Sequence, residues 1–333
     1  MPELTILVVA VVFFALVFDY INGFHDTANA IATVVATRVL KPNYAILMAA
    51  ALNFAGAIVA THVAKTIAKG VVDPSQATEV VVLAAVVGGI VWNLITWKYG
   101  IPSSSSHALI GGLMGAALIH GGFRIVEWNG ILNKVVYPLI GSPLAGFIIG
   151  YIVMQIIAAL FAHGHPNRVG KGFKAMQVVS SALMSFSHGQ NDAQKAMGII
   201  TLALVSGKFI PTAEVPLWVK LSCATAMALG TAAGGWRIMK TVGQKISRLE
   251  PVHGFAAETS GAAVILTAGH FGMPISTTHT ITASILGVGA SKRVSSVRWH
   301  VARNVIMAWI ITIPASAAFG AVAYMLFMTV GLK

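Results

Sequence analysis

Two polar segments interrupt long apolar stretches of the chain and carry the same residue types. One is Asn22-Gly-Phe-His-Asp-Thr-Ala-Asn29, and the other is Ser187-His-Gly-Gln-Asn-Asp-Ala-Gln-Lys195. Carboxylate and amide oxygens are the ligands that suit a hard cation. The alternative is that these side chains only cap helices and pair with one another. The predicted cation or coupling residues are His25, Asp26, Asn29, Asn191, Asp192, Gln194 and Lys195.

Two runs of hydroxyl residues each follow a proline. Pro102 precedes four consecutive serines, and Pro274 precedes Ile-Ser-Thr-Thr. Proline is favoured in the first turn of a helix and Ser or Thr at its cap, so each run is expected to open a helix. Free backbone N–H groups and hydroxyls at such a helix end bind anions, whereas plain capping needs only one hydroxyl. The predicted anion-binding residues are Ser104, Ser105, Ser106, Ser276, Thr277 and Thr278.

Other chemistries find little support in the residue types and their spacing. The serine before His107 does not predict a hydrolase, because adjacent residues on a helix do not face each other. No zinc-ligand spacing is present, and the single cysteine, Cys223, excludes an intrachain disulfide. We therefore expect no enzyme activity, no resident metal and no cofactor. Four histidines flank the motifs and are either proton shuttles or packed neutral donors: His25, His107, His188 and His279.

The composition predicts a membrane protein. Of 333 residues, 56% are hydrophobic and 10% are charged, and the mean hydropathy is +0.80. A soluble domain carries roughly 25% charged residues. The net charge of +12 is explained mainly by basic cytoplasmic loops, so nucleic acid is not expected as a partner. The apolar stretches approach or reach the roughly 20 residues that cross a bilayer: Leu4–Ile21, Ala45–Val63, Val80–Trp97, Val136–Phe161, Leu217–Ala233 and Val301–Phe327.

An internal repeat predicts the architecture. Gly23–Asp26 matches Gly189–Asp192, and Gly100–His107 matches Gly272–His279, in the same order in both halves. We assign residues 1–165 to a first repeat and residues 166–333 to a second, within one membrane unit. Equivalent loops carry opposite charge biases, which indicates inverted topology. The basic linker 163–174 is then cytoplasmic, and both termini are outside.

These elements define an all-α integral membrane protein with two inverted-topology repeats, broken helices and two re-entrant helical hairpins. The first helix is expected from about Leu4 to Thr37, broken near Gly23–Asp26, and a second span from Tyr44 to about Ala68. Residues 80–120 are expected to form a hairpin that turns at 102–106. A last span covers 136–161, and the second half repeats this order.

The duplicated motifs resemble those of the PiT family of inorganic phosphate transporters, in particular the bacterial low-affinity phosphate permeases. The resemblance covers nearly the whole chain and rests on Gly23–Ala30, His188–Ala196 and the two Pro-x-Ser-[Ser/Thr]-[Ser/Thr]-His hairpins. It implies a homodimer in the cell membrane, with phosphate held between the hairpin tips and cations at the Asp/Asn motifs. The implied function is secondary active import of phosphate, free or as a metal–phosphate complex, coupled to protons or sodium.

Two departures from the sodium-coupled members bear on the coupling ion. His25 stands where those members have an asparagine, and Lys195 stands opposite Asn29. A lysine ammonium can replace a bound cation, so the sequence favours protons over sodium. A cytoplasmic regulatory partner stays open.

Two rival functions also fit an anion site in a membrane. A sulfate permease of the same family would bind a tetrahedral oxyanion too, but only phosphate can donate a hydrogen bond at neutral pH. Asp26 and Asp192 are acceptors for such a bond, so phosphate is favoured. An anion channel is the other alternative, and saturable uptake that depends on an ion gradient separates a carrier from it.

Overall fold

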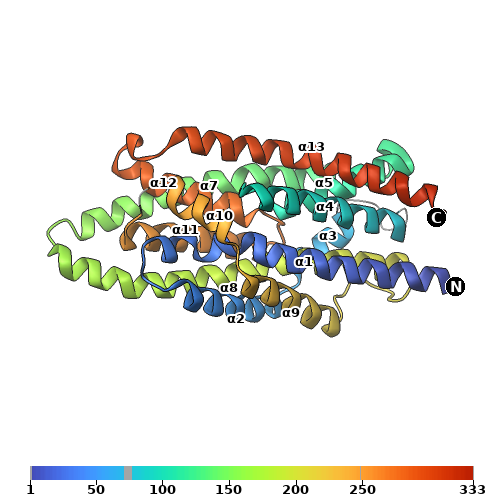
Figure 1. Cartoon of the computed structure of the whole chain (residues 1–333), viewed down its shortest axis with the longest axis horizontal. Coiled ribbons are helices and arrows are strands. Elements are labelled where there is room, and N and C mark those ends of the chain that lie inside the picture. The colour runs from blue at the N-terminus through green and yellow to red at the C-terminus, as the bar shows by residue number, and fades with distance from the viewer. Residues whose placement is uncertain (1, 71–76, 248, 333) are drawn as a thin grey trace.

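The computed structural model describes residues 2–70, 77–247 and 249–332 of the chain (Figure 1). This part is helical, and it includes an isolated β-type bridge between Ser247 and Val297. The first half contains α1 (Pro2–Ala36), α2 (Pro42–Val59), α3 (His62–Gly70), α4 (Glu79–Tyr99), α5 (Ser105–Gly121), α6 (Trp128–Ile131) and α7 (Tyr137–Leu160). The second half contains α8 (Pro166–Ser206), α9 (Leu217–Ala233), α10 (Trp236–Lys240), α11 (Pro251–His270), α12 (Thr277–Lys292) and α13 (Trp299–Thr329).

Five helical segments of the described chain are long and apolar enough to cross a membrane. The prediction of a multi-pass, all-helical membrane protein is therefore confirmed. Helix α8 is not among the five, because its second half carries many polar side chains. Those side chains are enclosed by neighbouring helices, so α8 does not need an apolar surface. The five segments are Ile6–Ala36, Pro42–Val59, Glu79–Tyr99, Trp128–Leu160 and Trp299–Thr329.

Helices of the two halves pack on one another in equivalent pairs. Helix α1 packs on α9, and its counterpart α8 packs on α2. Helix α5 packs on α13, and its counterpart α12 packs on α7. Helices α1, α2, α5 and α7 of the first half therefore pack directly against helices of the second half.

The two hairpins extend into the molecule from opposite ends. Both termini lie at one end, and the connection between α7 and α8 lies at the other (Figure 1). The α4–α5 hairpin lies in the half nearer the termini, and α11–α12 lies in the half nearer the α7–α8 connection. The predicted hairpin at 80–120 is confirmed, with its turn at 100–104.

The predicted break near Gly23–Asp26 is wrong. Helix α1 continues without interruption through that segment, and α8 continues through Gly189–Asp192. The glycines serve close packing instead. A Cβ on Gly23 would overlap the carbonyl oxygen of Met227 on α9, and one on Gly189 would overlap that of Asn53 on α2.

The breaks lie one helix later in each half. The second span, which we expected to run unbroken to about Ala68, stops at Ala60 and restarts as α3. Its counterpart stops at Gly234, in the left-handed region with φ 78°, and restarts as α10. Broken helices are therefore present, as the fold class predicted, but next to the polar motifs and not inside them.

Close packing at glycine gives a stability prediction. A Cβ on Gly115 of α5 would overlap the carbonyl group of Ala317 on α13, whereas one on Gly141 of α7 meets nothing within 4 Å. We expect Gly115→Ala to destabilise the protein by about 1–3 kcal/mol through overpacking. Gly141→Ala should be neutral or stabilising, since alanine favours helix. Thermal unfolding of both variants in detergent checks this, and equal melting temperatures would contradict it.

Candidate functional site

The tips of the two hairpins are built alike. Gly100 ends α4 and Gly272 follows α11, both with positive φ, at 65° and 68°. Ser104 then caps α5 by accepting a hydrogen bond from the N–H of His107 at 3.3 Å. Ser276 caps α12 in the same way, accepting from the N–H of His279 at 3.2 Å. Two of the six predicted anion-binding hydroxyls therefore have a capping role.

The tips meet in the interior of the protein. The hydroxyl of Ser106 donates to the carbonyl oxygen of Ile275 at 3.0 Å, which joins one tip to the other. The indole of Trp309 on α13 donates to the carbonyl oxygen of Pro102 at 3.3 Å. All six hydroxyl residues are buried, so the tips enclose a site that solvent does not reach in this conformation.

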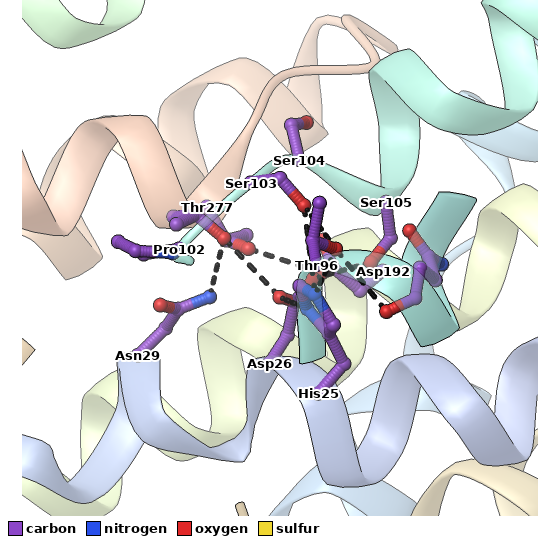
Figure 2. A network of polar contacts seen from close by, with 12 residues as sticks. His25, Asp26, Asn29, Thr96, Pro102, Ser103, Ser104, Ser105, Asp192 and Thr277 are labelled. Carbon is purple, nitrogen blue, oxygen red and sulfur yellow. Dashed lines mark hydrogen bonds and ion pairs between the residues drawn. The ribbon is translucent and has the colours of Figure 1, made fainter. Parts of the chain in front are cut away.

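The remaining hydroxyls bind the two aspartates of the polar motifs (Figure 2). Ser105 donates to Asp26 Oδ2 at 2.9 Å, and Thr277 donates to Asp192 Oδ2 at 3.0 Å. These two bonds are equivalent in the repeat. Thr278 also donates to Asp26 Oδ1, at 3.3 Å. The Asp26 carboxylate thus holds both hairpin tips at once.

The first motif adds a histidine to Asp26. His25 places Nδ1 2.7 Å from Asp26 Oδ1 and Nε2 3.0 Å from Thr96 Oγ1 on α4. Because a carboxylate only accepts, Nδ1 donates to Asp26. Ser103 donates to the same Thr96 hydroxyl at 2.9 Å. A hydrogen-bonded chain therefore leads from the hairpin turn through His25 to Asp26 (Figure 2).

The second motif holds a fixed cation. Lys195 donates to Asp192 Oδ1, and both side chains are buried. His188 places Nε2 3.3 Å from Asp192 Oδ2 and Nδ1 3.1 Å from Asn53 Oδ1 on α2. Asn29, the counterpart of Lys195, instead donates to Thr278 at 2.7 Å. The two halves therefore differ in charge at equivalent positions.

The site holds two buried carboxylates but one lysine. Burying a charge is costly unless it is paired and hydrogen-bonded. Lys195 compensates Asp192, whereas Asp26 relies on hydroxyl donors and on His25. A ligand atom from each of Asp26, His188 and Asp192 lies within 4.8 Å of the others, so one cation could contact all three.

Two predicted cation residues lie outside this network. Gln194 accepts hydrogen bonds from the N–H groups of Val63 at 2.8 Å and Ala64 at 3.2 Å. Its oxygen thus caps the first turn of α3, at the break that the sequence placed elsewhere. Asn191 is buried, and its side-chain amide has no hydrogen-bond partner among the described residues. Asn29 keeps its amide oxygen unpartnered in the same way.

Sequence reasoning missed Thr96 and Asn53, which orient the two motif histidines. Both are polar residues inside apolar spans, and that position is the signal that could have identified them. The other two histidines stack at the tips: the rings of His107 and His279 lie 4.6 Å apart, and His279 stacks on Trp309 at 3.9 Å.

Two helix N-termini with several hydroxyl groups, enclosed in a helical membrane protein, are features typical of a transporter for a small anion. The chain belongs to the phosphate transporter family, whose model matches residues 22–320. The predicted family resemblance is thereby confirmed, as is the expectation of a transporter and not an enzyme.

Relatives of high identity carry consistent names. The chain is 51% identical to the "Probable low-affinity inorganic phosphate transporter" of Bacillus subtilis, over 97% of this chain and 98% of that one. It is 49% identical to the protein of the same name from Rhizobium meliloti, over 96% of each. The solved structure of a sodium-dependent phosphate transporter aligns with TM-score 0.91 and 25% identity, over 97% of this chain and 99% of that one.

The tip hydroxyls give a binding prediction. We expect Ser105→Ala and Thr277→Ala each to weaken phosphate binding by about 1–2 kcal/mol, roughly 5- to 30-fold, because each removes one hydrogen bond to a charged group. The matched control is Thr282→Ala, a buried hydroxyl on α12 with no hydrogen-bond partner among the described residues. Phosphate titration of the purified variants measures this. Unchanged affinity in both tip variants would show that these hydroxyls serve only the fold.

The buried ion pair gives a stability prediction. Lys195→Met should destabilise the protein by about 3–5 kcal/mol, since it leaves Asp192 buried without its cation. The double variant Asp192→Asn/Lys195→Met removes both charges and should recover most of that loss. Thermal unfolding in detergent compares the three proteins. A double variant no more stable than Lys195→Met alone would contradict the pairing.

Proposed function

We propose that this chain is a secondary active transporter that imports inorganic phosphate together with protons, with phosphate bound between the hairpin tips. One observation carries the proposal: hydroxyls from both tips converge on the buried carboxylates of the two polar motifs. Donors of that kind bind an anion once they are released from the carboxylate. No other cluster of described residues combines two helix N-termini with several hydroxyls.

Competition for these hydroxyls would couple the proton to phosphate. An ionised Asp26 accepts from Ser105 and Thr278 and repels a bound anion. Protonation removes that charge and makes the carboxyl group a weaker acceptor. The two hydroxyls can then turn to phosphate, so proton and phosphate bind together. His25, which bridges Asp26 and Thr96, is placed to pass the proton on.

Lys195 would limit the number of exchangeable cations. It occupies the position equivalent to Asn29 and neutralises Asp192 in the structure. We infer that it acts as a permanent cation in the second half, so that coupling uses the first motif. This favours protons over two sodium ions, although the structural relative named above is sodium-dependent.

The arrangement of the hairpins suits alternating access. We infer that residues 1–165 and 166–333 are inverted-topology repeats, with the α7–α8 linker cytoplasmic and both termini outside. Equivalent helix pairing and hairpins at opposite ends support this (Figure 1). Movement of one tip away from the other would then open the site to one side of the membrane. A homodimer and a cytoplasmic regulatory partner stay predictions.

Proteoliposomes loaded at fixed internal pH test the coupling. With only a pH difference imposed, we expect wild-type protein to accumulate phosphate against its gradient, and sulfate not to compete. Asp26→Asn should abolish this accumulation but keep exchange of internal for external phosphate, because exchange needs no return of the empty carrier. If Asp26→Asn still exchanges phosphate but no longer responds to the pH difference, the defect lies in proton coupling and not in phosphate binding.

Three outcomes would count against the proposal. Accumulation driven by a sodium difference alone, with none from the pH difference, would exclude proton coupling. Loss of uptake after chelation of divalent cations would indicate that a metal–phosphate complex is the substrate, and would make Asp26, His188 and Asp192 the candidate ligands of its metal. Flux that does not saturate would indicate a channel.

A further inference from the structure

A second buried polar cluster lies outside the site described above. Asp19 and Asn22 of α1 and Asn93 of α4 are each fully buried. All six of their side-chain oxygen and nitrogen atoms lack a hydrogen-bond partner among the described residues. Buried polar groups in native proteins are nearly always paired, so a cluster of this size indicates a bound species or protons that heavy-atom positions do not reveal.

The register of α1 and α4 brings the three residues together. The ring of Phe18 on α1 lies 3.2 Å from the position that a Cβ on Gly89 of α4 would take. His25 on α1 is hydrogen-bonded to Thr96 on α4. Both contacts have a sequence separation of 71 residues, so the helices run parallel in register. The same offset sets Asn93 level with Asn22. Asp19 lies one turn before Asn22 on the same helical face.

Among the described residues, no unpaired positive charge faces Asp19. The charged groups that face it are Asp192, which repels it, and Lys195, which is already paired with Asp192. Helix α9 contributes only the thiol of Cys223, and α4 has no titratable side chain between residues 86 and 96. On α1 itself, His25 is bonded to Asp26. An ionised Asp19 would therefore be an uncompensated buried charge, which is too costly to persist.

The neighbours of Asp19 distinguish a proton from a metal ion. A metal ion would take the carboxylate and amide oxygens and leave the NH2 groups of Asn22 and Asn93 buried without acceptors. A protonated carboxyl group has one O–H donor and one carbonyl acceptor. A side-chain amide has a carbonyl acceptor for that O–H and an NH2 donor for that carbonyl. Two amides therefore match a carboxylic acid better than they match a cation.

We propose that Asp19 is a second proton-binding site of the transport cycle, protonated in this closed conformation beside Asn22 and Asn93. The inference rests on the proposed proton coupling and deepens it. Asp19, Asn22 and Asp26 share one face of α1, so the route by which a proton would reach Asp19 leads from the central site. On the other side of Asp19, toward the start of α1, buried apolar side chains leave no polar route for a proton: Val11, Ala15 and Phe18.

The proton balance follows from alternating access. When the central site opens outward, the Asp19 carboxylate takes a proton from water and becomes a carboxylic acid. When the site opens inward, the acid returns the proton to water. Each cycle then carries one proton on Asp19 in addition to the one on Asp26.

The phosphate gradient that balances an imposed pH gradient counts the protons. With the membrane potential clamped at zero in proteoliposomes, each coupled proton changes the balancing phosphate ratio tenfold per pH unit. We expect Asp19→Asn to lower that ratio tenfold per pH unit relative to wild type. The matched control is Glu79→Gln, which removes a buried carboxylate at the start of α4, away from the cluster, and should leave the ratio unchanged. An unchanged ratio in Asp19→Asn would overturn the proposal.

Infrared spectroscopy of the purified protein gives a readout that needs no transport. We expect a carboxylic-acid carbonyl band at neutral pH that appears in the difference spectrum of wild type minus Asp19→Asn, which cancels the signal of other buried carboxyl groups such as Glu258. The same band should be shifted in Asn93→Leu. If Asp19→Asn does not fold, the Asn93→Leu shift decides, and an unshifted band overturns the inference. A wild-type protein that shows the band but no proton-driven uptake would refute the proposed function while keeping a protonated Asp19.

Discussion

The structure depends on the burial of two carboxylates, Asp26 and Asp192, where no solvent can stabilise them. A buried charge persists only with a cation or with hydrogen-bond donors aimed at it. The protein supplies Lys195 to one carboxylate and hydroxyls from both hairpin tips to the other. The closed position of the tips and the state of the carboxylates are therefore linked, and this link is what a coupled carrier requires.

The helices that position these groups are held by close backbone contacts. Glycines let α1 approach α9 and let α8 approach α2, with no room for a side chain. Uninterrupted helices thus bring the polar motifs against the hairpin tips, and the breaks between α2 and α3 and between α9 and α10 lie beside these motifs. Small residues at helix interfaces are the general means of tight association inside a membrane.

Much of this fold could be predicted from the sequence, because its repeat and its apolar stretches are long and specific. The two hairpins, the tip hydroxyls and the acidic motifs were all identifiable by residue type. The location of the breaks was not, since a glycine signals both helix interruption and close packing, and only the neighbouring helix decides between them. Gln194 shows the same limit: its amide fits a cation site, yet its oxygen accepts hydrogen bonds at the break between the neighbouring helices α2 and α3.

Which hydroxyl binds which aspartate could not be fully predicted from the sequence either. The equivalence of Ser105–Asp26 and Thr277–Asp192 follows from the repeat, but the cross contact from Thr278 to Asp26 needs both hairpins in place. The buried group Asp19 could be recognised as polar within an apolar run. That the one lysine facing it is already paired with Asp192 became evident only from the packing of α4, α8 and α9 around it.

The central claim is that phosphate and the carboxylate of Asp26 compete for the same hydroxyls, and that a proton decides between them. Calorimetric titration of phosphate in two buffers of different ionisation enthalpy counts the protons that bind with it. We predict that wild-type protein takes up about one proton more per phosphate bound than Asp26→Asn, because the variant mimics the protonated acid. Equal proton uptake by the two proteins, with phosphate binding intact in both, would contradict the claim.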